Sequence, residues 1–207
     1  MSIEKSYNNW AEQYDTNENK TRDLDRKATI QTLSKYNFEN VIELGCGTGK
    51  NTEWLVTKAK FIIGLDFSEE MLNKAKSKII SEKIRFQRAD LKKPWEIENS
   101  FADLITCSLT LEHIENLDFI FNQAHQKLKV GGKFFISELH PARQYLGSKA
   151  KYETENGIKE LEVYTHHISE YLNSGKNNSF KLIELNEWFD NQSENQIPRL
   201  ISFVFSK

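Results

Sequence analysis

Short apolar runs alternate with longer amphipathic stretches through most of the chain. The runs at 41–44 and 61–65 are typical of strands buried on both faces of a sheet, and helical spacing of apolar residues follows each of them. Strands that alternate with helices predict right-handed βαβ units around a parallel sheet. The predicted strands are 41–44, 61–65, 84–88, 101–107 and 133–138, and the predicted helices are 22–36, 51–58, 69–81 and 117–128.

The pattern changes after Pro141. Residues around Asn156 and Gly157 alternate in a way that predicts a hairpin over 152–164, and a helix is predicted over 166–173. Two strands, 180–189 and 199–205, follow with no helix between them, so they must be antiparallel. The chain therefore predicts an α/β fold with a seven-stranded mixed sheet, antiparallel at its last strands, and helices on both faces.

Length and composition fit a single globular domain. The 207 residues include 13 Phe, 7 Tyr and 4 Trp, enough large side chains to build a core. A net charge of −2 lacks the basic excess of proteins held by nucleic-acid phosphates. No apolar run is long enough to span a bilayer, and Cys46 and Cys107 are too few and too far apart for a disulfide framework. We expect a cytoplasmic monomer or homodimer with no metal, membrane or nucleic-acid partner.

The first predicted strand leads directly into a glycine-rich turn. Gly45, Gly47 and Gly49 are spaced G-x-G-x-G, and Glu43 precedes the first of them by two residues. Glycines let a backbone turn sharply and approach a ligand closely, and open α/β sheets bind nucleotides beyond the carboxyl ends of such strands. The dinucleotide fingerprint G-x-G-x-x-G would need glycine at Lys50. A nicotinamide oxidoreductase is therefore the disfavoured alternative.

Four ordered motifs resemble the class I S-adenosylmethionine-dependent methyltransferases, specifically the small-molecule branch similar to methyltransferase types 11 and 25. The motifs are 41–49, 63–68, 86–91 and 128–132. The resemblance implies the Rossmann-like fold of that family, S-adenosyl-L-methionine as cofactor, and in-line transfer of a methyl group to a small-molecule acceptor. A non-catalytic protein of this fold that binds S-adenosylmethionine or S-adenosylhomocysteine is one alternative, and a protein or RNA methyltransferase is another.

The resemblance also implies where the cofactor would bind. Asp66 would accept hydrogen bonds from both ribose hydroxyls, Asp90 would accept the adenine amino proton, and Phe67 and Met71 would enclose the adenine, although Met71 fits a plain core position nearly as well. Cys46 is expected to fill the loop instead of acting as a nucleophile. The expected cofactor-binding residues are Tyr14, Arg22, Glu43, Gly45, Cys46, Gly47, Gly49, Asp66, Phe67, Met71, Ala89, Asp90, Leu91, Ser108 and Leu109.

The single domain is expected to divide into four parts. Residues 1–38 would form an amino-terminal lid with helices, 39–139 the cofactor-binding core, 140–178 a substrate-side insertion, and 179–207 the last antiparallel strands. In related enzymes an aromatic amino-terminal segment covers the cofactor, and ordinary helix packing is the alternative for this one. Acceptor specificity would then reside in the first and third parts.

A general base is needed only where the acceptor must lose a proton, and histidines are the candidates. His140 directly follows the fifth strand, so it is either a base or substrate contact in the crevice or a structural hydrogen-bonding group of the loop. For His113, packing is as plausible as a role near the methyl group. The weaker catalytic candidates are His166 and His167, and the candidate substrate contacts are Tyr7, Trp10, His113, Arg143 and Tyr145.

Overall fold

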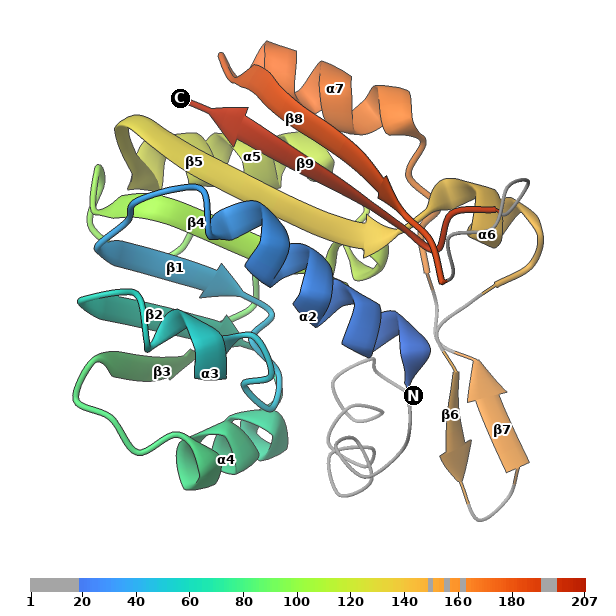
Figure 1. The fold of residues 1–207 in the computed structure, drawn as a ribbon, viewed down its shortest axis with the longest axis horizontal. Helices are drawn as coiled ribbons and strands as arrows, with labels where there is room; N and C mark the ends of the chain where they lie inside the picture. The colour runs from blue at the N-terminus through green and yellow to red at the C-terminus, as the bar shows by residue number, and fades with distance from the viewer. Residues whose placement is uncertain (1–18, 149–150, 155–156, 161–162, 191–196) are drawn as a thin grey trace.

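The computed structural model describes residues 19–148, 151–154, 157–160, 163–190 and 197–207 (Figure 1). Its helices are α2 (Lys20–Leu33), α3 (Thr52–Leu55), α4 (Glu69–Lys78), α5 (Leu117–Lys127), α6 (Pro141–Tyr145) and α7 (Ile168–Asn177), with a 3-10 turn η1 (Leu111–His113). Its strands are β1 (Asn40–Leu44), β2 (Phe61–Asp66), β3 (Ile84–Arg88), β4 (Ala102–Ser108), β5 (Leu128–Leu139), β6 (Lys151–Thr154), β7 (Gly157–Glu160), β8 (Lys181–Trp188) and β9 (Leu200–Ser206). None of the helices in these ranges has the length and apolar character needed to cross a membrane.

Seven strands form one mixed sheet in the order β3-β2-β1-β4-β5-β9-β8. Strands β1 to β5 pair in parallel, and β9 is antiparallel to both of its neighbours, β5 and β8. Strands β6 and β7 pair with each other as a separate antiparallel hairpin. The predicted mixed sheet with antiparallel last strands is confirmed.

Helices cover both faces of the sheet, as predicted. Figure 1 shows α2 and α3 in front of the sheet and α5 and α7 behind it. Neighbouring residues of one strand point to opposite faces, so Val41 and Phe135 pack on the side of α2, while Ile42 and Phe134 pack on the side of α5. Burial on both faces explains why the central strands read as continuous apolar runs.

Several element boundaries differ from the prediction for local reasons. Helix α4 ends at Lys78 because Ile79 is already extended, with φ −113° and ψ 90°. Strand β5 begins at Leu128 instead of Lys133, and Gly131, at φ +80°, lies where the pairing register with β4 shifts. Helix α6 and the turn η1 were not predicted, because segments of five and three residues are too short to show helical periodicity.

The register of the central strands brings three carboxyl ends to one edge of the sheet. Leu44 lies beside Leu65 of β2 and beside Cys107 of β4. The glycine-rich turn after β1, Asp66 at the end of β2, and Ser108 at the end of β4 therefore meet at this edge. As predicted, Ser68 caps the helix that follows β2, and its side chain accepts a hydrogen bond from the Met71 N–H at 3.2 Å.

Candidate active site

Two adjoining clefts lie at the carboxyl edge of the sheet. The first cleft has a volume of about 750 Å³, including its open mouth, and its lining residues are Gly45, Gly47, Asp66, Phe67, Met71, Ala89, Asp90, Leu91, Lys92, Ser108, Leu109, Thr110, His113 and Ile114. The second cleft is lined by Arg22, Asp25, Glu43, Leu44, Gly45, Cys46, Gly47, Thr48, Lys50, Asn51, Thr106, Ser108 and Leu109. Four lining residues are common to both, so the two clefts meet at the glycine-rich turn and the end of β4.

Most of the cofactor residues expected from the sequence lie in these clefts. Ten of them line the first cleft, and Arg22, Glu43 and Cys46 line the second. Gly49 lines neither, because it faces α4, where an added Cβ would lie 2.6 Å from the Ile79 Cδ1 atom. The expected contacts Tyr7, Trp10 and Tyr14 lie outside the described residues.

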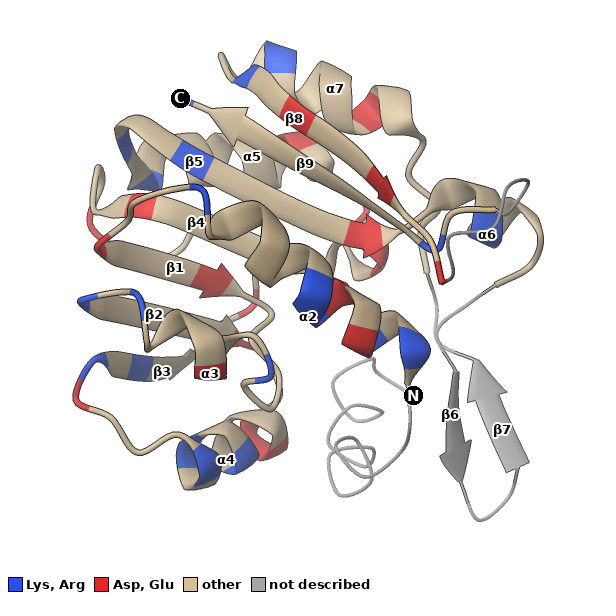
Figure 2. Ribbon diagram, in the orientation of Figure 1, with Lys and Arg blue, Asp and Glu red and all other residues tan. Residues whose placement is uncertain are grey.

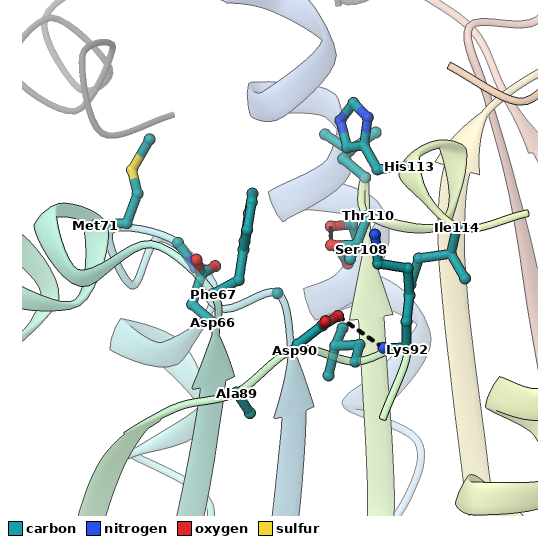
Figure 3. A pocket seen from close by; sticks show the side chains of 14 residues that line it. Asp66, Phe67, Met71, Ala89, Asp90, Lys92, Ser108, Thr110, His113 and Ile114 are labelled. Atoms are coloured by element: carbon teal, nitrogen blue, oxygen red, sulfur yellow. Dashed lines mark hydrogen bonds between the residues drawn. The ribbon is translucent and has the colours of Figure 1, made fainter. Parts of the chain in front are cut away.

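Figure 3 shows how the side chains of the first cleft are arranged. The Phe67 ring projects into the cleft from the end of β2, and His113 lies on the far side of the cleft. Asp90 follows β3, and its Oδ1 atom accepts a hydrogen bond from the Lys92 backbone N–H at 3.0 Å. The cleft therefore has an acidic and aromatic side, formed after β2 and β3, and a second side formed by the segment after β4.

At Gly45 the glycine-rich turn lets another segment of the chain approach its backbone closely, and at Gly47 it leaves open space beside the backbone. A Cβ added to Gly45, at φ +65°, would lie 2.1 Å from the Thr110 Oγ1 atom. A Cβ added to Gly47, at φ +52°, would meet no atom within 4 Å. The first glycine thus lets the chain after β4 pack against the turn, and the second exposes backbone to the clefts.

Asp66 is buried at the junction of the glycine-rich turn and α4. Its Oδ2 atom accepts a hydrogen bond from the Gly47 N–H at 2.8 Å, and its Oδ1 atom accepts one from the Ser68 N–H at 2.9 Å. Burial raises the pKa of Asp66 to about 6, although these N–H groups favour the ionised form. The Phe67 N–H is a third backbone donor to this carboxylate, which keeps lone-pair capacity for a ligand hydroxyl.

Buried carboxyl groups also line the second cleft. Burial raises the pKa of Glu43 to about 8, and the Thr52 hydroxyl donates to its Oε2 atom at 2.5 Å. Burial likewise raises the pKa of Asp25, whose Oδ2 atom accepts a hydrogen bond from the Asn51 side-chain amide at 2.9 Å. Figure 2 shows acidic positions on α2 and near the carboxyl ends of β1 and β5. With Arg22 beside Asp25 on α2, this cleft suits a ligand end that carries both an ammonium and a carboxylate group.

Sequence reasoning missed several lining residues. Asp25 stands three residues after Arg22, so the two share one face of a helix, and that spacing could have found it. The residues missed in the first cleft follow strands that the sequence did predict. After each of these strands, more of the chain lines the cleft than we expected. These residues are Lys92, Thr110 and Ile114.

His140 lies outside both clefts. Its Nδ1 atom accepts a hydrogen bond from the Ala142 N–H at 3.1 Å, which caps α6, and its Nε2 atom lies 3.0 Å from the Glu187 Oε1 atom. Because Nδ1 is an acceptor, the ring hydrogen is on Nε2 and is donated to Glu187. This geometry favours the structural hydrogen bond to the loop that the sequence left open as the alternative to a catalytic role.

The other candidates from the insertion also lie outside the clefts. The His166 Nε2 atom lies 2.8 Å from the Ile114 carbonyl oxygen, and the His167 Nδ1 atom lies 2.5 Å from the Tyr145 hydroxyl. The Arg143 guanidinium donates to the carbonyl oxygen of Ile197 at 2.9 Å. All four side chains hold parts of the chain together, whereas His113 lines the first cleft.

Replacement of His140 by alanine is expected to lower stability and to leave ligand binding in the clefts unchanged. The loss of a helix N-cap costs about 1 kcal/mol, which corresponds to roughly 2–4 °C in Tm for a chain of this size. Thermal unfolding of H140A and H140N provides the measurement, since asparagine can still cap α6. A variant with wild-type stability but a weakened site would contradict the structural role.

Comparisons with known proteins agree with this fold. A sequence model of the family described as methyltransferase domain matches residues 42–136. An uncharacterised protein of Haemophilus influenzae is 27% identical over 161 residues, which cover 75% of this chain and 62% of that protein. Demethylmenaquinone methyltransferase of Bacteroides fragilis is 29% identical over 147 residues, which cover 66% of this chain and 60% of that protein. The chain thus spans less than two thirds of either relative.

A solved structure shares the architecture over most of its length. The crystal structure of an S-adenosylmethionine-dependent methyltransferase from Mesorhizobium loti matches with a TM-score of 0.74 and 22% identity, over 89% of this chain and 98% of that one. At that identity the likeness is one of fold. The region matched by the family model, 42–136, contains every residue that lines the first cleft.

Proposed function

Since this chain carries a class I methyltransferase domain, we propose that it transfers the methyl group of S-adenosyl-L-methionine to a small-molecule acceptor. One observation carries the proposal. Two clefts that differ in chemistry meet at the glycine-rich turn, one with an aromatic ring and carboxylates, the other with buried carboxyl groups and an arginine. A long ligand with a nucleoside at one end and an amino acid at the other matches that division.

The residues present fit this cofactor in shape and charge. The open space at Gly47 leaves room for a ligand against the backbone between the clefts. Burial raises the pKa values of Asp25, Glu43 and Asp66. A cationic ligand bound beside these groups favours their ionised form, and the ionised carboxylates attract the ligand. When bound, the cofactor supplies an electrophilic methyl group on a positively charged sulfur.

Each part of the cofactor has candidate partners in the chain. Asp66 would accept the ribose hydroxyls, Asp90 the adenine amino group, and the Phe67 ring would lie against the base. In the second cleft, Arg22 would pair with the cofactor carboxylate, and Asp25 and Glu43 would face its ammonium group. Alignment and exclusion of water are the main tasks of the protein in such a displacement.

The part of the first cleft that the cofactor assignments leave unfilled supports a small acceptor. Thr110, His113 and Ile114 line the first cleft across from Phe67. The name of the Bacteroides fragilis relative specifies a quinone as its acceptor, which supports the small-molecule class over a protein or RNA. A net charge of −2 also provides no bulk attraction to RNA.

Calorimetric titration and a turnover assay test the proposal. We expect S-adenosyl-L-methionine and S-adenosylhomocysteine to bind and NAD to give no heat of binding. Release of S-adenosylhomocysteine in the presence of an acceptor separates an enzyme from a non-catalytic binding protein. NAD binding without a response to the methyl donor would overturn the proposal.

Cofactor affinity is expected to rise with pH between 5 and 7. Ribose hydroxyls donate to the ionised form of Asp66, and the pKa of that carboxyl is about 6. The ionised fraction is small at pH 5 and nearly complete at pH 7.5, so the dissociation constant should fall by about tenfold across this range. Titrations at several pH values provide the measurement. The D66N variant should lose this part of the pH dependence. If cofactor affinity in D66N still changes with pH as in the wild type, the pH dependence belongs to another group.

A further inference from the structure

The chain makes a tight turn over residues 90–93, directly after β3. The Asp90 Oδ1 atom accepts a hydrogen bond from the Lys92 backbone N–H at 3.0 Å, and the Asp90 carbonyl oxygen accepts one from the Lys93 N–H at 2.9 Å. Aspartate is favoured at the first position of a β-turn because its side chain bonds the backbone two residues further on. The backbone of the two lysines is therefore fixed by this turn.

Buried side chains anchor the same turn to the core. Leu91 and Trp95 are both buried, and the Trp95 Nε1 atom donates a hydrogen bond to the Leu91 carbonyl oxygen at 3.3 Å. The Trp95 backbone N–H donates to the Gln123 Oε1 atom on α5 at 2.9 Å. Because the turn is tied both to the core and to α5, the side chain of Lys92 starts from one fixed place beside the first cleft.

Lys92 is the lysine that this turn places in the first cleft. It is the only Lys or Arg among the described residues that line this cleft, whereas Lys93 lines neither cleft. Figure 3 shows the Lys92 side chain extending past Ile114 toward the end of β4. Within the described part of the chain, the Lys92 ammonium group has no hydrogen-bond or ion-pair partner. Lys92 is exposed, so a ligand that enters the cleft can reach this group.

The cofactor proposed for the two clefts provides no partner for this charge. Its ribose and adenine, assigned to Asp66 and Asp90 in the first cleft, are uncharged. Its carboxylate is assigned to Arg22 in the second cleft, and its sulfur is positively charged, as Lys92 is. The other ligand of the first cleft, the methyl acceptor, is then the source of an anion for Lys92.

We propose that the methyl acceptor carries a carboxylate group and that Lys92 binds this carboxylate and so determines acceptor specificity. This inference rests on the proposed function. An ammonium group donates up to three hydrogen bonds, and those to an ionised acceptor are about twice as strong as neutral ones. Lys92 holds the acceptor at its charged end while the nucleophilic atom faces the methyl group. It orients the acceptor and takes no part in the bond changes.

The charge of the first cleft favours a carboxylate over a phosphate. Lys92 provides one positive charge, which balances the single negative charge of a carboxylate. A phosphate dianion would keep an unbalanced charge and would be repelled by Asp66 and Asp90, which line the same cleft.

4-Mercaptobenzoate and 4-mercaptobenzamide are matched probes for this charge. They differ only in the group opposite the sulfur, and both are thiolates at pH 8, so neither needs a base. Transfer forms the new bond from thiolate sulfur to the methyl carbon as the carbon–sulfur bond of the cofactor breaks, and it releases S-adenosylhomocysteine. For the wild type we expect kcat/KM to be at least about tenfold higher with the benzoate than with the benzamide.

Variants of the two lysines in the turn test where this preference arises. K92Q should lower the ratio of the two kcat/KM values to about one, and K92R should keep most of it, because the charge remains. K93Q changes the neighbouring lysine, which lines neither cleft, and should match the wild type. Added salt should lower the ratio in the wild type and not in K92Q, since it screens an exposed charge. Each ratio compares two probes on one variant, so a partial loss of folded protein cancels.

The possible outcomes separate this inference from the proposed function. Equal kcat/KM values with the two probes in the wild type, transfer to neither probe, or a preference that K92Q retains would overturn the role of Lys92. A K92Q variant that binds S-adenosyl-L-methionine much more weakly and keeps the preference would assign Lys92 to the cofactor and also overturn it. A wild type that does not bind S-adenosyl-L-methionine would overturn the proposed function itself.

Discussion

Replacement of Asp66 by alanine is expected to weaken the binding of S-adenosyl-L-methionine by about a hundredfold or more. The variant loses the carboxylate that would accept both ribose hydroxyls, and a hydrogen bond to a charged group contributes about 1.5–3 kcal/mol. Two such bonds amount to at least about 3 kcal/mol, which is more than a hundredfold in the dissociation constant. Calorimetric titration of D66A at pH 7.5 gives the value directly.

Two controls separate this loss from damage to the glycine-rich turn. Asp66 also accepts hydrogen bonds from Gly47 and Ser68, so thermal unfolding of D66A must be measured beside its affinity. 5′-Methylthioadenosine contains the ribose but no amino acid, and its affinity should fall by the same factor. E69A removes an acid from the exposed first turn of α4 and should leave binding unchanged. An unaltered affinity in D66A would refute the ribose assignment.

The central sheet was predictable because each of its strands is marked by a pattern within its own short stretch of sequence. Strands β1 and β2 are buried on both faces, and their apolar runs stand out from neighbouring sequence. The last strands were recognised because no helix separates them, which fixes their relative direction. Helix α6 and the turn η1 were not recognised, since a single turn of helix leaves no repeat to detect.

The candidate site was predictable where its residues follow strand ends. Asp66, Asp90 and Ser108 each end or follow a parallel strand, and such ends share one edge of the sheet. The position of His140 was not predictable by this rule, although it also follows a strand. Pro141 begins a helix there, and the ring turns to Glu187, which is 47 residues away in sequence. The contact depends on how β8 and β5 are brought together by β9, which no local pattern reveals.

Replacement of Gly45 by alanine is expected to damage both clefts together. The backbone at φ +65° costs a non-glycine residue roughly 1–2 kcal/mol, and the added Cβ would lie 2.1 Å from the Thr110 Oγ1 atom. Thr110 is not free to move away, because its hydroxyl donates to the Ser108 carbonyl oxygen at 2.9 Å and its N–H is held by Glu138. We expect a loss of about 3 kcal/mol in the free energy of unfolding, or roughly 6–12 °C in Tm.

A rescue variant and a matched glycine distinguish the collision from backbone strain. Thr110→Ala in the G45A background removes the Oγ1 and Cγ2 atoms, at 2.1 and 2.8 Å, and leaves the Thr110 Cβ at 3.0 Å. It should therefore restore part of the lost stability and cofactor affinity. G147A changes a glycine at φ +89° with no atom within 4 Å of the added Cβ. Its free energy of unfolding should therefore fall only by the strain of a non-glycine residue in the left-handed conformation. Equal losses in G45A and G147A, with no rescue by T110A, would mean that close approach of the turn to the segment after β4 does not shape the site.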